Sequence, residues 1–298
     1  MTWSTWARTF VVVGVLGLLG DAGIATAEGG WEFVLEFGNG PGDIAVDSIH
    51  NVYVLDVEYG RIQVFTSEGL FLRERTGLSY ARGIAIDEND EIYVVNYRHD
   101  YPPSGWVLRY GLDFQPLGGW EYAHGDLEAG LGIDVHDGLV YVGTANDMLK
   151  FATDGRLLDI FEGAGWDAVE IATDGSVWGV NSETGSGLVR HYSPDGAILA
   201  EWSTILPGEE GSYPRGLALD TRNRVFVADD GARVKIFVSD GTLDDLIQWQ
   251  MRVFLALELD GDDLLYVGAD FPDRVMKFGQ KLVPVEPVTW GEIKSRFR

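Results

Sequence analysis

Residues 42–72 read GDIAVDSIHNVYVLDVEYGRIQVFTSEGLFL, and residues 215–243 read RGLALDTRNRVFVADDGARVKIFVSDGTL. In both stretches, short apolar runs alternate with clusters of Asp, Asn, Gly and Ser, which is typical of short strands joined by tight turns. The two stretches align with each other. The sequence therefore contains an internal repeat, and this repeat decides the fold class.

Two columns of aromatic residues mark six copies of the repeat. The first column, in the second strand of each copy, consists of Tyr53, Tyr93, Tyr141, Trp178, Phe226 and Tyr266. The second column, in the third strand, consists of Phe65, Tyr110, Phe151, Tyr192, Phe237 and Phe278. Members of the first column are 37 to 48 residues apart. An average near 43 fits a four-stranded propeller blade, and no long segment shows helical periodicity.

The sixth copy has only three convincing strands, which end at residue 278. An unassigned strand, Trp31–Phe37, precedes the first copy, and we expect it to pair beside Val275–Phe278 as the outer strand of the sixth blade. Such closure removes two open sheet edges. We therefore predict an all-β, six-bladed β-propeller whose last blade is closed by an N-terminal strand. An open solenoid or a seven-bladed ring would leave Trp31–Phe37 unexplained.

The two quoted stretches resemble the NHL repeat, and weaker versions extend the likeness over about residues 31–280. The resemblance, to the exported bacterial type, implies a six-bladed propeller but no single activity, since this fold hosts binding scaffolds and several enzymes. The Asp–Arg pairs of that family are kept at Asp56/Arg61, Asp229/Arg233 and Asp270/Arg274, which we interpret as structural ties. RNA binding, which the resemblance would also allow, is opposed by the charge of the chain and by its predicted export.

The chain has two terminal segments outside the repeat. Residues 1–27 read as a signal peptide, with Arg8 before the apolar run 10–19 and an Ala-Thr-Ala cleavage site at 25–27. An uncleaved anchor is the alternative. We expect an exported protein, periplasmic or extracellular, with no transmembrane segment in the mature chain.

The propeller is then expected over residues 28–282, followed by a Pro-containing linker and a basic amphipathic tail over 283–298. The tail would serve as a docking or sorting tag, or would lie along the acidic body of its own propeller.

Composition restricts the partners. The 47 acidic residues exceed the 22 Lys and Arg, which gives a net charge of −25. Nucleic acids and anionic membranes bind positive patches, so neither is an expected partner. The chain has no Cys, which excludes disulfides, zinc–thiolate sites and cysteine nucleophiles. We expect a monomer.

The innermost strand of each repeat is aliphatic on one face and small or acidic on the other. The second face should point into the central channel. Asp134, Glu170 and Glu258 lie at one level of this face. Their mutual repulsion would raise each pKa, and a hard cation such as Ca²⁺ would relieve it. Ca²⁺ is thus the one cofactor suggested; the alternative is a wet channel in which the acids are solvated or neutral.

The channel mouth and the long loops supply the remaining candidates for ligand binding. Arg82, Asp167 and Arg215 precede the aliphatic positions, and Arg can bind a carboxylate or phosphate in a bidentate manner. Pairing with nearby acids is the alternative.

Aromatic residues gather in the insertion of repeat two at Tyr97, Tyr101 and Trp106. Exposed rings there would suit a sugar or a peptide; otherwise they pack on their own blade.

These observations predict a binding or scaffold propeller that recognises a protein, peptide or glycan through its loops and channel mouth. The alternative is a lactonase- or lyase-like propeller enzyme that depends on a divalent metal. No His occupies the mouth positions where zinc-dependent propeller lyases carry theirs, and no nucleophile motif is present. We therefore name no catalytic residue, and binding is favoured over catalysis.

Overall fold

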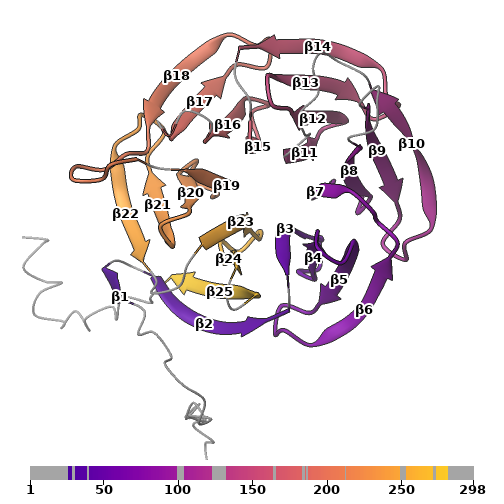
Figure 1. Ribbon diagram of the computed structural model, residues 1–298, viewed down its shortest axis with the longest axis horizontal. Coiled ribbons are helices and arrows are strands. Elements are labelled where there is room, and N and C mark those ends of the chain that lie inside the picture. The colour runs from indigo at the N-terminus through magenta and orange to yellow at the C-terminus, as the bar shows by residue number, and fades with distance from the viewer. Residues whose placement is uncertain are drawn as a thin grey trace, which may run out of the picture.

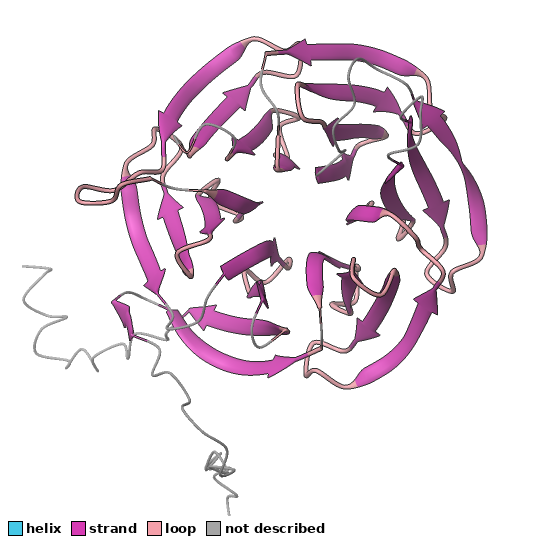
Figure 2. Ribbon diagram, viewed as in Figure 1, coloured by secondary structure: helices cyan, strands magenta, loops and turns pink. Residues whose placement is uncertain are grey.

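The computed structural model describes residues 26–28, 31–38, 40–98, 104–122, 132–163, 166–182, 185, 187–211, 213–248, 253–270 and 273–280. Within these residues the chain forms strands and no helix. Six small antiparallel sheets surround a central axis, so the predicted six-bladed β-propeller is confirmed (Figures 1 and 2).

Each blade is a meander whose first strand lies nearest the axis and whose last strand forms the rim (Figure 1). Blades one to three consist of β3 (Pro41–Val46), β4 (Val52–Asp56), β5 (Arg61–Phe65) and β6 (Phe71–Thr76); β7 (Ala81–Ile86), β8 (Ile92–Arg98), β9 (Ser104–Tyr110) and β10 (Pro116–Tyr122); and β11 (Gly132–His136), β12 (Leu139–Gly143), β13 (Asp147–Ala152) and β14 (Leu157–Glu162).

Blades four to six follow the same plan. They consist of β15 (Ala168–Ile171), β16 (Val177–Asn181), β17 (Leu188–Tyr192) and β18 (Ile198–Ser203); β19 (Pro214–Leu219), β20 (Val225–Asp229), β21 (Arg233–Phe237) and β22 (Leu243–Gln248); and β23 (Val253–Leu259), β24 (Leu265–Asp270) and β25 (Arg274–Gln280), completed by β2 (Trp31–Phe37).

The N-terminal strand β2 closes the ring as predicted. It pairs antiparallel with β25, so that Phe37 lies opposite Val275 and Trp31 opposite Gln280. The first and last parts of the propeller thus share one sheet, and β25 has no open outer edge. Trp31 is fully buried and meets Phe226 of blade five edge-on at 5.4 Å between ring centroids.

One strand was not predicted. Residues Thr26–Glu28 form β1, which pairs with the outer edge of β22 and makes blade five a five-stranded sheet (Figure 1). Thr26 and Ala27 belong to the predicted signal peptide. The remainder of that segment, residues 1–25, and the predicted tail 283–298 lie outside the described residues, so both stay predictions. No helix of the described part is long and apolar enough to cross a membrane.

The aromatic columns lie between blades. All six members of the first column are buried in hydrophobic clusters, each of which combines side chains of two neighbouring blades. Burying one such side chain contributes about 1.5–3 kcal/mol. Since each cluster needs both of its blades, the ring is stabilised as a whole.

The second column explains a repeated glycine. At four seams an aromatic residue of the rim strand packs on the second-column ring of the next blade; the pairs are Trp120–Phe151, Phe161–Tyr192, Trp202–Phe237 and Phe37–Phe65. The hairpin turn beside that ring holds a glycine with a φ between +77° and +89°, at Gly155, Gly196, Gly241 and Gly69 respectively. A Cβ atom at any of these would lie within 3.0 Å of the incoming aromatic side chain.

The seam between blades one and two departs from this pattern. The rim strand β6 presents Arg75, whose guanidinium carbon lies 5.2 Å from the ring centroid of Tyr110. The turn position that elsewhere is glycine is Phe114, with a φ of +63°. Its buried ring meets Tyr53 of blade one edge-on at 6.3 Å.

Candidate functional site

The inner edges of the blades carry carboxylates that join neighbouring blades. The free edge of each innermost strand faces the channel, and its N–H groups need acceptors. Asp43 accepts from the N–H of Ile84 in blade two at 2.8 Å, and Asp134 accepts from the N–H of Ile171 in blade four at 2.6 Å. Each also accepts from the N–H of the residue that follows it, Ile44 or Val135.

Burial raises the pKa of all four channel carboxyls. The pKa of Asp43 rises to about 7 because the group is buried, with a further contribution from repulsion by Asp134. The pKa of Asp134 rises to about 6, also through burial. Burial and repulsion between the acids raise the pKa values of Glu170 and Glu258 well above the ordinary value. The burial of these four groups therefore favours their neutral forms.

The acids surround a cavity of about 70 Å³. That volume holds a few water molecules, since one water needs roughly 10–15 Å³ of such space. Asp134, Glu170 and Glu258 all line it, as predicted from the two-residue alternation. Asp43 lines it too, although the sequence pattern places Asp43 at another level of the channel than these three acids. Among the described residues, no three His, Cys, Asp or Glu side chains are grouped so that one ion could contact them all. The Ca²⁺ site stays a prediction without a geometric counterpart.

Two of the three predicted mouth residues come together. Arg215 and Asp167 line the cavity, with 3.5 Å between Arg215 Nη1 and Asp167 Oδ1. Asp167 also accepts a hydrogen bond from the N–H of Ser182 at 2.7 Å. For Arg215, pairing with a nearby acid is thus what the structure shows. Arg82 does not line the cavity, and its Nε atom is buried without a hydrogen-bond partner.

The expectation of an exposed ring at Tyr97 is wrong. Tyr97 is 2% exposed and packs in the cluster between blades two and three with Val107 and Tyr122. The reason is that β8 continues to Arg98, two residues further than the equivalent strand β4 of blade one, so Tyr97 belongs to the sheet and not to the insertion. Tyr101 lies outside the described residues.

Trp106 is half-buried and lines a second cavity, of about 220 Å³, together with Ser79, Asn96 and Leu108. We call this the Trp106 cavity. Asn96 donates from Nδ2 to the Ser79 carbonyl at 2.9 Å, while its Oδ1 is buried without a hydrogen-bond partner. Native proteins rarely leave a buried carbonyl oxygen unpaired. The sequence alone does not indicate this role for Asn96, because the partner of its amide, Ser79, lies 17 residues earlier on the connection from blade one.

Backbone strain lies beside the same cavity. Tyr80, next to Ser79, has a φ of +67° and is 53% exposed. A bulky residue in the left-handed region is uncommon. Its backbone strain costs about 1–3 kcal/mol, and it persists only where the surrounding structure holds it there. The carbonyl of Tyr80 accepts from the N–H of Tyr97 at 3.0 Å, which fixes the connection.

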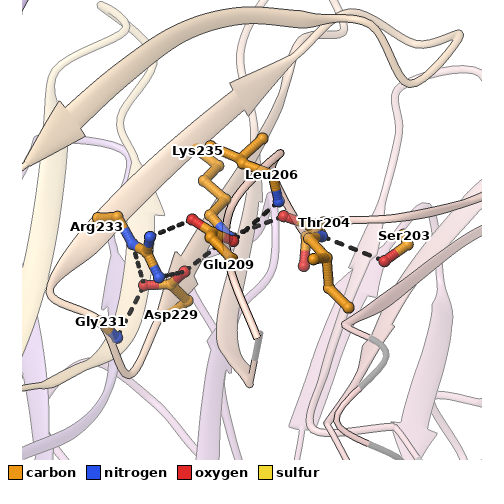
Figure 3. A network of polar contacts seen from close by, with 9 residues as sticks. Ser203, Thr204, Leu206, Glu209, Asp229, Gly231, Arg233 and Lys235 are labelled. Carbon is orange, nitrogen blue, oxygen red and sulfur yellow. Dashed lines mark hydrogen bonds and ion pairs between the residues drawn. The ribbon is translucent and has the colours of Figure 1, made fainter. Parts of the chain in front are cut away.

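A second polar cluster, in blade five, pairs its charged groups with one another (Figure 3). The buried Lys235 Nζ lies 2.9 Å from Asp229 Oδ2 and 2.7 Å from Glu209 Oε2, and it donates to the Thr204 carbonyl. Arg233 contacts both carboxylates. Two cations balance two anions, so this cluster is a structural tie.

The Asp229–Arg233 pair inside this cluster is one of the predicted ties. Asp56 and Arg61 form another, at 2.8 Å. The side chain of Asp270, the acid of the third pair, lies outside the described residues.

Many solved structures are similar to this chain, and two of them illustrate the likeness. The WD40 β-propeller domain of Doa1 has a TM-score of 0.60 at 13% identity, covering 85% of this chain and 98% of that one. The structure of streptogramin B lyase has a TM-score of 0.58 at 15% identity, covering 80% of this chain and 78% of that one. No protein-family model matches the chain, and no curated protein matches it. These likenesses show the propeller fold alone, and the NHL resemblance stays a prediction.

Proposed function

We propose that this protein is an exported, monomeric binding propeller whose ligand occupies the Trp106 cavity. One observation carries the proposal: the cavity joins an aromatic side chain, a buried unpaired acceptor and a strained, exposed neighbour. Ligand sites combine apolar walls with a few placed polar groups, and strain of this kind clusters at functional positions. The polar cluster of blade five, by contrast, satisfies its charged groups internally.

Binding is favoured over the lactonase- or lyase-like alternative by the chemistry of the channel. Asp43 and Asp134 accept hydrogen bonds from backbone N–H groups of the next blade, and burial and repulsion between the acids raise the pKa values of Glu170 and Glu258. The described residues form no group suited to a shared ion. A metal-dependent reaction would need such a group. The Trp106 cavity offers a surface for recognition, and none of the four described residues that line it carries a titratable side chain.

Arrays of neutral glycans and of short peptides test this proposal with the full chain. We expect at least one array to give ligands whose affinity falls ten-fold or more in Trp106→Ala, while the thermal midpoint stays within a few degrees of the wild type. The exposed rim residue Leu117 provides the control, because Leu117→Ala should bind like the wild type. Ligands on neither array, or binding indifferent to Trp106→Ala, would refute the proposed site.

A further inference from the structure

The Trp106 cavity is built mainly on a rigid sheet. Asn96 of β8 and Trp106 of β9 are directly opposite one another in the strand register, and Leu108 follows Trp106 by two residues on the same face. Ser79 belongs to the connection from blade one, which is held by the Asn96 amide and by a hydrogen bond from the Leu78 N–H to the Gly60 carbonyl at 2.8 Å. The cavity is thus formed before any ligand arrives.

The unpaired oxygen of Asn96 defines the first chemical requirement. Asn96 is 8% exposed, and its Nδ2 is already engaged with the Ser79 carbonyl. The amide orientation therefore leaves Oδ1 as an acceptor, and only an O–H or N–H group can satisfy it. The Ser79 hydroxyl adds a group that can donate or accept. A ligand that fits must bring at least one hydrogen-bond donor to Asn96 Oδ1.

The walls define the second requirement. Trp106 and Leu108 supply apolar surface, and the face of an indole ring is electron-rich, so it attracts the weakly positive C–H groups of a ligand. Among the described residues, the four that line the cavity carry no formal charge, and the protein as a whole has a net charge of −25. An anionic ligand would be repelled, and a cationic one would find no carboxylate among these residues.

We propose that the Trp106 cavity binds one ring of a neutral carbohydrate, an inference that rests on the proposed binding function. A pyranose ring has a face of C–H groups that can stack on Trp106 and a rim of hydroxyl groups that can donate to Asn96 Oδ1. It has no charge. It therefore meets both requirements in one rigid unit, whereas a free phosphate, a carboxylate or an amine does not.

Two further aromatic side chains favour a chain of sugars over a single sugar. Tyr80 adjoins Ser79, and Tyr59 adjoins Gly60, whose carbonyl binds the same connection. Both are largely exposed, and neither belongs to a core cluster. Tyr80 is held in a left-handed conformation that a glycine or an asparagine would adopt with less strain. The presence of a tyrosine at this strained position is explained if the ring itself contacts a neighbouring sugar unit.

The test is calorimetric titration of the full chain with three neutral probes, cellohexaose, xylohexaose and chitohexaose, and with the peptide amide Gly-Tyr-Gly. We expect one hexasaccharide to bind, with at least ten-fold weaker binding by Trp106→Ala and an intermediate affinity for Trp106→Phe. Tyr80→Gly should remove the preference for the hexasaccharide over its monosaccharide. Leu117→Ala, on the rim, should leave the affinity unchanged.

A second variant guards against misfolding of Trp106→Ala. Ser79 is exposed on its connection, so Ser79→Trp should fill the cavity and abolish binding without disturbing the core. If only Gly-Tyr-Gly binds, and does so through Trp106, the carbohydrate assignment is wrong while the binding function stands. If neither class of probe binds, the carbohydrate assignment falls, and array binding then decides the function. Oligosaccharide binding that survives both Trp106→Ala and Ser79→Trp would overturn the assignment to this cavity.

Discussion

At the seam between blades two and three, Trp120 of the earlier blade covers Gly155 of the later one. At the seam between blades one and two the roles are reversed, because Phe114 of the later blade reaches back to Tyr53 of the earlier one. Arg75 takes the place that Trp120 holds in its own strand. Both seams bury one aromatic side chain at the rim. A blade can therefore depart from the repeat pattern when two contacting positions change together.

The largest effect is expected at the reversed seam. Phe114→Ala should destabilise the protein by about 3–5 kcal/mol, the usual cost of removing a buried aromatic ring. Phe114→Gly should lose about 1 kcal/mol less, because glycine relieves the left-handed backbone. Adding Arg75→Trp to Phe114→Gly rebuilds the common seam and should recover part of the loss. Urea unfolding of the wild type, Phe114→Gly, Arg75→Trp and the double variant measures the coupling between the two positions in a double-mutant cycle. Strictly additive losses of stability would contradict the compensation.

The common seam is tested at its glycine. In Gly155→Ala the new Cβ would lie 2.7 Å from Trp120, in addition to the strain of a φ of +89°. Gly77 is a matched control, since its φ is +84° and an added Cβ atom would have no neighbour within 4 Å. We expect a loss of about 1 kcal/mol for Gly77→Ala and about twice that for Gly155→Ala. Equal losses would show that the contact with Trp120 is unimportant.

The inner side of the seams is tested through the pH dependence of stability. The pKa of Asp43 in the folded protein, about 7, lies above its unfolded value near 3.9. The protonated Asp43 therefore stabilises the folded state fully below about pH 4. This contribution to the free energy of unfolding is lost as the pH rises toward 7, by at most about 1.4 kcal/mol per pH unit. Asp134 acts in the same direction up to about pH 6.

Thermal midpoints between pH 5 and pH 8 test this expectation. The midpoint should fall as the pH rises, and Asp43→Asn should flatten the curve. Asp113→Asn, at an exposed turn of blade two, serves as the control. A midpoint that climbs from pH 5 to pH 7 in the wild type would show that the channel acids are ionised throughout.

Much of the fold followed from local pattern, while the candidate site did not. The aromatic columns and the missing outer strand predicted six blades and the pairing of Trp31–Phe37 with β25. Two-residue alternation also placed Asp134, Glu170 and Glu258 in the channel correctly. Tyr97 was misjudged because the end of a strand is set by pairing with its neighbour, which the sequence of one strand does not reveal. Asn96 was missed for a related reason: its free oxygen exists only because Ser79 occupies its amide.

The amino-acid sequence by itself determined the repeat, the strand periodicity and the number of blades, because these depend on residues close together in the chain and on their hydrophobic pattern. Only the tertiary structure decided which polar atoms find partners. The acceptor of Asn96, the raised pKa of Asp43 and the reversed seam at Phe114 all depend on groups brought together from different blades. Burial and hydrogen bonding are properties of that assembly, and they set the chemistry of the site.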